Sequence, residues 1–375
     1  MDAGAADRAS RDAALVLCLT LPADTVLYLL LPLHHGEFGV TLGETGLLLA
    51  ANRLVRICGY GWVARFYGTR GPRLACLLAA VGAAIAALGY ATASGVWTLL
   101  PTRLLWGLCF AAQNIATQAL PTAELPGAAR RSGRARAVIA TGPMLGLLAG
   151  TALAQHAGPR PVFLVLAGLS LLAIPFALRL PSDPETGILV AGPRFAPPSP
   201  LDLWSFVQGL ALDGLFVVGL SVLAAAALPG EAALAAGAAL ALRYAAEVVL
   251  GPVGGALAVR CGARPLLVLL SAAAAVGLAL VGLGALWPGA ILVVLLRGLL
   301  QPLPAPIAAA ANPGAARVPA LARLATWRDL GAGAGPLLAG MLLPVLPAPM
   351  LYGGAAVCLG AAALGLVSRR ARSGD

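Results

Sequence analysis

Long apolar stretches, separated by short segments rich in arginine, glycine and proline, cover almost the whole chain. Each stretch has roughly the 20 residues that an α-helix needs to cross the hydrocarbon core of a bilayer. A spanning β-barrel would instead show segments of about 10 residues with alternating polarity, whereas runs such as Ala75–Tyr90 and Leu266–Leu286 are apolar and unbroken. The pattern predicts an all-α membrane protein of twelve transmembrane helices, over residues 13–33, 44–66, 72–91, 97–119, 136–156, 160–180, 204–228, 233–257, 265–287, 289–311, 320–343 and 348–367.

The composition supports this interpretation, because 60% of the 375 residues are hydrophobic and only 11% are charged. A soluble domain carries about 25% charged residues, and a disordered chain needs low hydrophobicity with high net charge. At about 30 residues for each helix and its connection, no sizeable soluble domain remains. The first stretch could be mistaken for a signal peptide, but it contains Asp24 and is followed by eleven more; we expect it to be retained.

The distribution of arginine predicts the topology. All 25 basic residues are Arg, and the loops and termini on one side of the predicted bundle, including Arg136, hold 18 of them against Arg160 alone on the other. By the positive-inside rule both termini are cytoplasmic, in a multi-pass protein of the cytoplasmic membrane. The charge is scattered over short loops without interleaved aromatic residues, so a nucleic-acid partner is not expected.

Motifs for cofactors, metals and catalysis are not found. The six cysteines lie singly without a CxxC pair, and no phosphate loop, GxSxG or HExxH signature occurs. His34, His35 and Glu37 are interpreted as a solvated loop, because adjacent histidines point in different directions. We therefore expect no metal, no cofactor, no enzymatic activity and no ATP-driven transport by this chain alone.

The chain repeats itself across a segment rich in proline and glycine, residues 181–203, which we interpret as a cytoplasmic linker between halves 1–180 and 204–375. Gly61, Gly68, Arg70 and Arg103 recur 194 residues later as Gly255, Gly262, Arg264 and Arg297, and Gly142-Pro143 recurs 193 residues later as Gly335-Pro336. Asp24 and Asp213 occupy the first helix of each half at a different offset. Such a repeat predicts two six-helix halves of the same orientation.

Residues 61–70, between the second and third helices, resemble the signature Gly-x-Leu-x-Asp-Arg-x-Gly-x-Arg of the major facilitator superfamily, and residues 255–264 are a second copy. The resemblance implies a secondary transporter in which two bundles rock about a midplane site. The Asp of the signature, which in the family locks the outward-open state against helix 11, is replaced by Arg65 and Val259. Arg65 either pairs with Asp329 of helix 11 or is one more topogenic arginine.

The Gly-Pro pairs in helices 5 and 11 resemble the antiporter motif of that family, in part at Gly142-Pro143 and more fully at Gly335-Pro336. Proline bends a helix and glycine permits close approach, so both suit a rocking bundle. Ordinary packing of small residues explains them equally well.

Ten ionisable residues fall within predicted spans: Asp24, Arg53, Arg56, Arg103, Asp213, Arg243, Glu247, Arg297, Arg328 and Asp329. Each costs at least about 2.5–3.5 kcal/mol at the centre of a bilayer, so we expect them to face the bundle interior. Six Arg against four acids leave a formal excess of +2, which favours an anionic or carboxylate-bearing substrate held by Arg. Arg243 and Glu247, four residues apart, are predicted to pair on one helix face.

Three sets of residues are given roles. Asp24 is the first candidate for proton coupling and Asp213 the second, since a carboxylate buried in apolar surroundings takes up protons more readily than one in water. Substrate binding is predicted for seven polar residues: Asn52, Arg53, Arg56, Arg103, Gln113, Asn114 and Arg297. By analogy with the family, Asp24, Arg103, Asp213 and Arg297 of helices 1, 4, 7 and 10 should face the pore. Gating or structural roles are predicted for the repeated motifs and the remaining charges: Gly61, Arg65, Gly68, Arg70, Gly142, Pro143, Arg243, Glu247, Gly255, Gly262, Arg264, Arg328, Asp329, Gly335 and Pro336.

The favoured function is proton-coupled efflux of a small organic solute by a monomeric carrier in the lipid bilayer, which rests on similarity to the drug- and siderophore-exporting members of the family. An importer of a carboxylate metabolite shares every residue discussed. A channel or passive facilitator, and a membrane-embedded enzyme or receptor-like scaffold, remain alternatives.

Overall fold

The computed structural model describes residues 3–184, 197–219 and 232–368, and the described residues form helices joined by turns, without a strand. The helices of the first half are α1 (Ala3–Leu33), α2 (Leu42–Thr92), α3 (Val96–Ala119), α4 (Ala128–Ala157), α5 (Pro159–Leu171) and α6 (Ile174–Leu178). Those of the second half are α7 (Pro200–Gln208), η1 (Gly209–Leu215), α9 (Ala232–Cys261), α10 (Ala263–Gly282), α11 (Leu286–Leu300), α12 (Pro304–Ala311), η2 (Gly314–Ala316), α13 (Arg317–Leu342) and α14 (Ala348–Ser368).

These elements make twelve passes. Nine helical segments in the described residues are long and apolar enough to cross a membrane. One of them, α2, crosses twice and so accounts for two passes. The remaining two passes are α3 and α13, which are not among the nine because their polar residues lower their mean hydropathy. The predicted fold class, an all-α membrane protein of twelve helices, is confirmed.

The second and third predicted spans are continuous in α2, which turns at Gly71 with φ 82° and ψ 161°. A side chain there would meet the carbonyl oxygen of Ser182, and this positive φ favours glycine. This turn lies three residues after Gly68 of the first signature copy. In the second copy it lies at Gly262, with φ 84°.

Proline residues interrupt two of the predicted spans. The span predicted over 160–180 is divided into α5 and α6 just before Pro175, and the span over 289–311 into α11 and α12 just before Pro304. Proline lacks the amide that a continuing helix needs. The helix α7 begins at Pro200, four residues before the predicted 204, because Ser199 and Asp202 form a capping box there.

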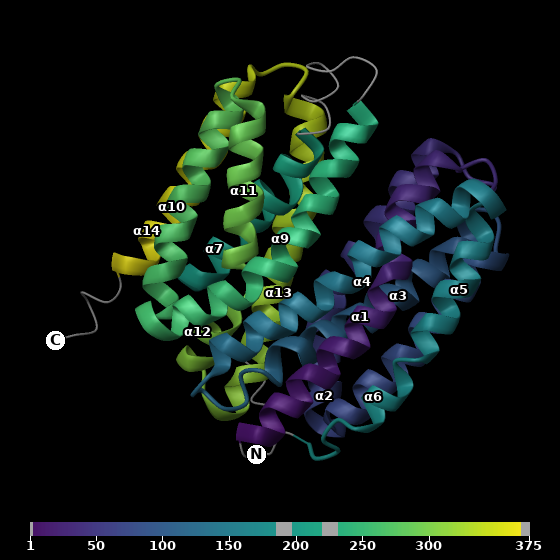
Figure 1. Cartoon of the computed structure of the whole chain (residues 1–375), viewed down its shortest axis with the longest axis horizontal. Helices are drawn as coiled ribbons and strands as arrows, with labels where there is room; N and C mark the ends of the chain where they lie inside the picture. The colour runs from purple at the N-terminus through teal and green to yellow at the C-terminus, as the bar shows by residue number, and fades with distance from the viewer. Residues whose placement is uncertain (1–2, 185–196, 220–231, 369–375) are drawn as a thin grey trace.

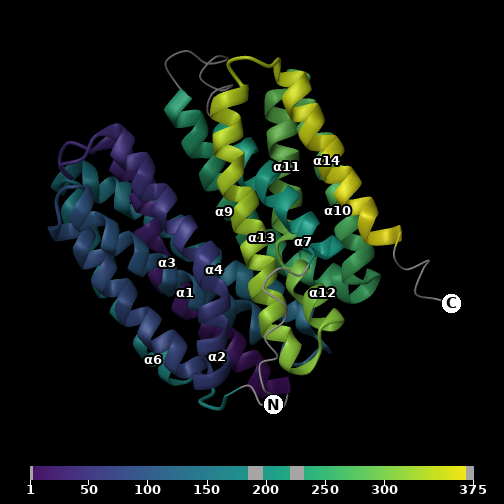
Figure 2. The same cartoon turned by 180° about the vertical axis from the view of Figure 1, so that it is seen from behind.

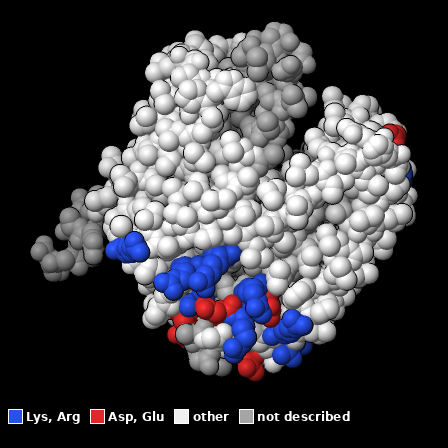
Figure 3. Space-filling model, in the orientation of Figure 1, with Lys and Arg blue, Asp and Glu red and all other residues white. Residues whose placement is uncertain are grey.

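The helices gather into two bundles, α1–α6 and α7–α14, which meet at the end of the molecule that carries the N-terminus and diverge at the other end (Figures 1 and 2). Basic side chains are concentrated at the end where the bundles meet (Figure 3). There α4 crosses α9 closely: a Cβ built at Gly133 would lie 3.2 Å from the Cα of Gly255. The space between the diverging helices is therefore open at one end and closed at the other.

The two Gly-Pro pairs lie where helices of the same bundle touch. A Cβ at Gly142 of α4 would meet the backbone of Cys18 in α1, and one at Gly335 of α13 would lie 2.6 Å from the Cα of Gly214 in η1. Both glycines permit close packing of the fifth helix of a half against the first helix of that half.

Candidate functional site

A cavity of about 360 Å³ lies between the two bundles. Ten charged side chains line it: Asp24, Arg53, Arg56, Arg136, Asp213, Arg243, Glu247, Arg297, Arg328 and Asp329. Nine of the ten ionisable residues predicted within spans are in this set, with Arg136 in place of Arg103. The lining again holds six Arg and four acids, a formal excess of +2. Charges that would be costly in lipid thus face one shared interior space.

Asp24 of α1 is held by groups from the second and third helical elements. Its Oδ1 accepts from Arg103 Nη1 at 2.5 Å and from Asn52 Nδ2 at 3.2 Å. Arg103 is fully buried, and it also donates from Nε to the carbonyl of Leu48 at 3.1 Å and from Nη1 to the hydroxyl of Tyr90 at 3.4 Å. This guanidinium is therefore part of the wall behind the acid.

The predicted substrate-binding residues separate into two groups. Arg53, Arg56, Asn114 and Arg297 line the cavity. The other three, Asn52, Arg103 and Gln113, lie behind its wall, where Gln113 Oε1 accepts from the hydroxyl of Thr20 at 2.6 Å. The second group positions Asp24 and α1.

Asp213 lies among three guanidiniums. Its Oδ1 accepts from Arg297 Nε at 2.6 Å and from Arg243 Nη2 at 3.4 Å. Its Oδ2 accepts from Arg328 Nε at 3.0 Å and Nη2 at 2.9 Å, and from Gln208 Nε2 at 3.3 Å. The carboxylate thereby joins α9, α11 and α13 to its own helix.

The local backbone around Asp213 is the π-helix η1, a form that occurs frequently at functional sites. The predicted pair of Arg243 with Glu247 is not formed. Glu247 instead accepts from Arg297 Nη1 at 3.2 Å, while Arg243 donates to Asp213. Arg243 and Glu247 thus each pair with a residue on another helix rather than with each other.

A polar contact joins the two bundles between α2 and α13. Arg56 Nη2 donates to Asp329 Oδ1 at 3.1 Å, and the hydroxyl of Tyr60 donates to Asp329 Oδ2 at 3.0 Å. Asn114 Nδ2 donates to that hydroxyl at 3.0 Å, and the guanidinium of Arg56 stacks 4.4 Å from the ring centroid of Phe110. We call Arg56, Tyr60 and Asp329 the latch.

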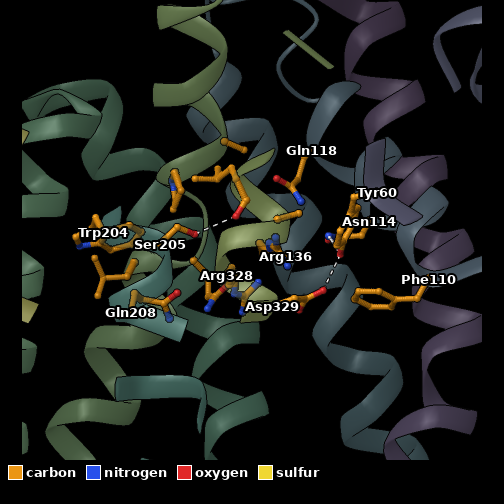
Figure 4. Close-up of a pocket in the computed structure, with 16 residues that line it drawn as sticks. Tyr60, Phe110, Asn114, Gln118, Arg136, Trp204, Ser205, Gln208, Arg328 and Asp329 are labelled. Atoms are coloured by element: carbon orange, nitrogen blue, oxygen red, sulfur yellow. Dashed lines mark hydrogen bonds between the residues drawn. The ribbon is translucent and has the colours of Figure 1, made fainter. Parts of the chain in front are cut away.

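A smaller cavity of about 60 Å³ adjoins the latch (Figure 4). Arg56 lines only the large cavity, Tyr60 only the small one, and Asp329 both. The latch thus runs from one cavity to the other. Amide and hydroxyl groups from both bundles line the small cavity: Asn114, Gln118, Ser205, Gln208 and Gln301.

Two arginines assigned to the cytoplasmic edge have different positions. Arg65 is exposed, and Asp329, its possible partner, is held by Arg56 and Tyr60 instead. Arg136 lines both cavities from α4. The sequence held a signal for this placement, because the 193-residue offset of the Gly-Pro pairs makes Arg136 the counterpart of Asp329.

The repeated signature lies outside the site. Neither cavity is lined by its glycines and arginines: Gly61, Gly68, Arg70, Gly255, Gly262 and Arg264. At the opposite end of the molecule His34 Nδ1 lies 2.8 Å from Glu37 Oε1 in the loop after α1. The described residues contain no cluster of three His, Cys, Asp or Glu suited to a metal ion.

Solved structures of transporters have this fold. The human organic anion transporter MFSD10 (TETRAN) superposes with a TM-score of 0.78 at 20% identity, over 96% of this chain and 99% of that one. The proton:xylose symporter XylE bound to 6-bromo-6-deoxy-D-glucose gives 0.75 at 13% identity, over 98% and 95%. The E. coli fucose:proton symporter FucP gives 0.73 at 12% identity, over 96% and 98%. These likenesses establish the fold.

A comparison with curated proteins gives no significant match. The sequence profile described as "Major Facilitator Superfamily", however, matches residues 13–230, more than half of the chain. The chain therefore belongs to the major facilitator superfamily.

Proposed function

We propose that this protein is a secondary active transporter that moves a small organic anion across the cytoplasmic membrane by alternating access. The observation that carries the proposal is the cavity between the bundles, whose charged lining has a formal excess of +2. An anion entering it would be held by arginines, whose planar guanidiniums bind carboxylates through two hydrogen bonds. A cation would be repelled by the same lining.

Two arginines in the lining are available to such a substrate. Among the described residues Arg53 and Arg136 have no acid within ion-pair distance, although both line the large cavity. They come from different elements of the first half, α2 and α4. The acidic group of a solute in the cavity can therefore be bound by arginines from two different helices. The structural neighbour MFSD10 is described as an organic anion transporter, which is the same substrate class.

Alternating access requires that the closed end can open. The halves 1–180 and 204–375 are the units proposed to rock, with both termini cytoplasmic. In that orientation the latch and the α4–α9 crossing close the cytoplasmic side, and the cavity faces outward. Breaking the latch would expose the small cavity and its amide groups to the cytoplasm. The carrier is proposed to act as a monomer without a cofactor.

Proton coupling is assigned to Asp24. Its counter-charge is one guanidinium, Arg103, so protonation would free a single arginine. Protonation of Asp213 would leave three guanidiniums without their shared acid. We propose that proton uptake at Asp24 drives efflux of the anion by antiport.

Flux in proteoliposomes tests the proposal. Purified protein would be reconstituted and loaded with radiolabelled benzoate, succinate or citrate, and a pH gradient of either sign imposed. Saturable efflux of a carboxylate that is faster when protons enter than when no pH gradient is imposed is expected. Uptake driven by the same gradient would indicate an importer instead. Transport confined to cationic solutes, or ion conductance at channel rates, would contradict an anion carrier.

A further inference from the structure

Asp213 has a different electrostatic environment from Asp24, although each lies on the first helix of its half. Asp24 pairs with one guanidinium, that of Arg103. Asp213 pairs with Arg297, the counterpart of Arg103 at the 194-residue offset, and additionally with Arg243 and Arg328. Both halves thus contain one acid paired with one arginine, and the second half has two further arginines at its acid; we call Arg243 and Arg328 the added arginines.

The added arginines have apolar counterparts in the first half. The 194-residue offset between α2 and α9 relates Arg243 to Leu49, and the 193-residue offset between α4 and α13 relates Arg328 to Ala135. The first bundle packs its helices with those two apolar residues. Holding the bundle together therefore does not require arginine at either place.

Exposure to the cavity separates the two kinds of arginine. The side chain of Arg297 is 4% exposed, whereas those of Arg243 and Arg328 are 19% and 28% exposed. Both added arginines line the large cavity, and Arg243 Nε is buried without a hydrogen-bond partner among the described residues. Arg297 is thus the least accessible of the three partners of Asp213, and the two more accessible guanidiniums meet the carboxylate from the cavity.

We propose that the carboxylate of Asp213 occupies the place of the substrate's acidic group. The arriving carboxylate, or another small oxyanion, takes the guanidiniums of Arg328 and Arg243. Asp213 keeps its 2.6 Å contact with Arg297 through Oδ1, and it gives up the contacts of Oδ2 with Arg328 and the 3.4 Å contact of Oδ1 with Arg243. Arg243 and Arg328 are then not left without a counter-charge while the cavity is empty, because Asp213 neutralises what the substrate will neutralise. This inference rests on the proposed function, since it names the subsite for the transported anion.

Chemical rescue by acetate tests the proposal. Asp213→Ala removes the internal carboxylate, and acetate supplies one of the same chemistry. Thermal unfolding of the purified full-length variant would be followed in rising sodium acetate, against equal concentrations of sodium chloride. We expect acetate to raise the melting midpoint of Asp213→Ala by at least about 3 °C more than chloride does. Wild-type protein should respond by less than half as much, because Asp213 competes for the site.

Control variants locate the response. Asp24→Ala should gain little from acetate, since its partner Arg103 is fully buried. Adding Arg243→Gln and Arg328→Gln to Asp213→Ala should abolish the rescue. Should Asp213→Ala fail to fold, Asp213→Asn keeps the volume of the side chain and should show the same preference for acetate.

An equal acetate effect on wild type, Asp213→Ala and Asp24→Ala would overturn the proposal, as would a rescue that survives loss of both arginines. The experiment needs no transport. A carrier that moves organic anions yet shows no rescue would refute this subsite alone, and a rescue without flux would refute the proposed function alone.

Discussion

Individual buried charges hold this molecule together, and Arg103 is the strongest case. Its guanidinium is fully buried, pairs with Asp24 and contacts the rings of Tyr28 and Tyr90. Removing one partner of a buried ion pair leaves an uncompensated charge and costs about 3–5 kcal/mol. We therefore expect Arg103→Gln to lower the midpoint of thermal unfolding strongly.

The matched control for this prediction is Arg53→Gln, since no ion pair or hydrogen bond is found for Arg53 among the described side chains. It should leave the midpoint within about 2 °C of wild type, because no buried counter-charge is lost. Combining Arg103→Gln with Asp24→Asn should cost less than the two single changes together. Equal midpoints for Arg103→Gln and Arg53→Gln would show that the pair contributes no stability.

Asp24→Asn separates folding from coupling. The amide keeps the size of the side chain and can still accept from Asn52, so the variant should fold, with a lowered unfolding midpoint because Arg103 loses its counter-charge, and still exchange labelled anion for unlabelled anion. It cannot alternate between a charged and a protonated state, and accumulation driven by a pH gradient should be lost. Counterflow and gradient-driven transport would be measured in the same proteoliposomes, with Asp202→Asn, at the edge of the bundle, as the control. Full gradient-driven transport by Asp24→Asn would remove this residue from the mechanism.

The residues of the site were only partly predictable. The cost of charge in lipid identified nine of the ten charged residues in the cavity lining, because that argument needs only a span and a side chain. That argument did not identify Arg136, because the predicted span begins at residue 136 whereas α4 begins eight residues earlier, at Ala128. Arg136 was therefore grouped with the arginines of the cytoplasmic loop, although it lines the cavity. The partners within the set depend on helix packing, which is why Glu247 was expected beside Arg243 and lies beside Arg297.

At the scale of helices, the crossing of α4 and α9 closes one end of the cavity. Gly133 and Gly255 allow the two backbones to touch, and a larger side chain at Gly133 would meet the backbone of Gly251. Gly133→Leu should therefore separate the helices and open the small cavity at the end of the molecule that carries the N-terminus.

A cysteine in place of Ala305, which lines the small cavity, reports this opening. With the native cysteines replaced, a membrane-impermeant maleimide applied from the side of the N-terminus should label it several-fold faster in Gly133→Leu. The control is Gly168→Leu in α5, where a Cβ meets nothing within 4 Å. Equal labelling rates in the two variants would show that this crossing does not close the cavity.

Helix positions followed from hydropathy, whereas their internal irregularities did not. The interruptions before Pro175 and Pro304 coincide with proline residues, but Pro101, Pro143 and Pro336 lie inside uninterrupted helices, so proline alone does not predict a break. The π-helix around Asp213 has no comparable signal in the sequence, and the partners of its carboxylate lie on three other helices. Tertiary contacts decide such local geometry.

At the scale of the whole molecule, the twelve passes could be predicted from the chain, since hydropathy is a property of sequence, while the duplication inferred from the constant offset stays a prediction. The sequence does not predict at which end of the molecule the cavity is open. In a protein with two conformations, the two differ by a few kcal/mol, so small differences in contact decide which of them prevails.

The most direct test of alternating access is the distance between the bundles at both ends, measured by double electron–electron resonance in nanodiscs. Spin labels at Gly36 and Leu283 report the open end, and labels at Thr69 and Ala316 report the closed end; all four positions are exposed. We expect two populations at each end, and a change of pH or a transported anion should lengthen one distance while shortening the other. A single unchanging distance at both ends, or two ends that widen together, would contradict a carrier built from two rocking bundles.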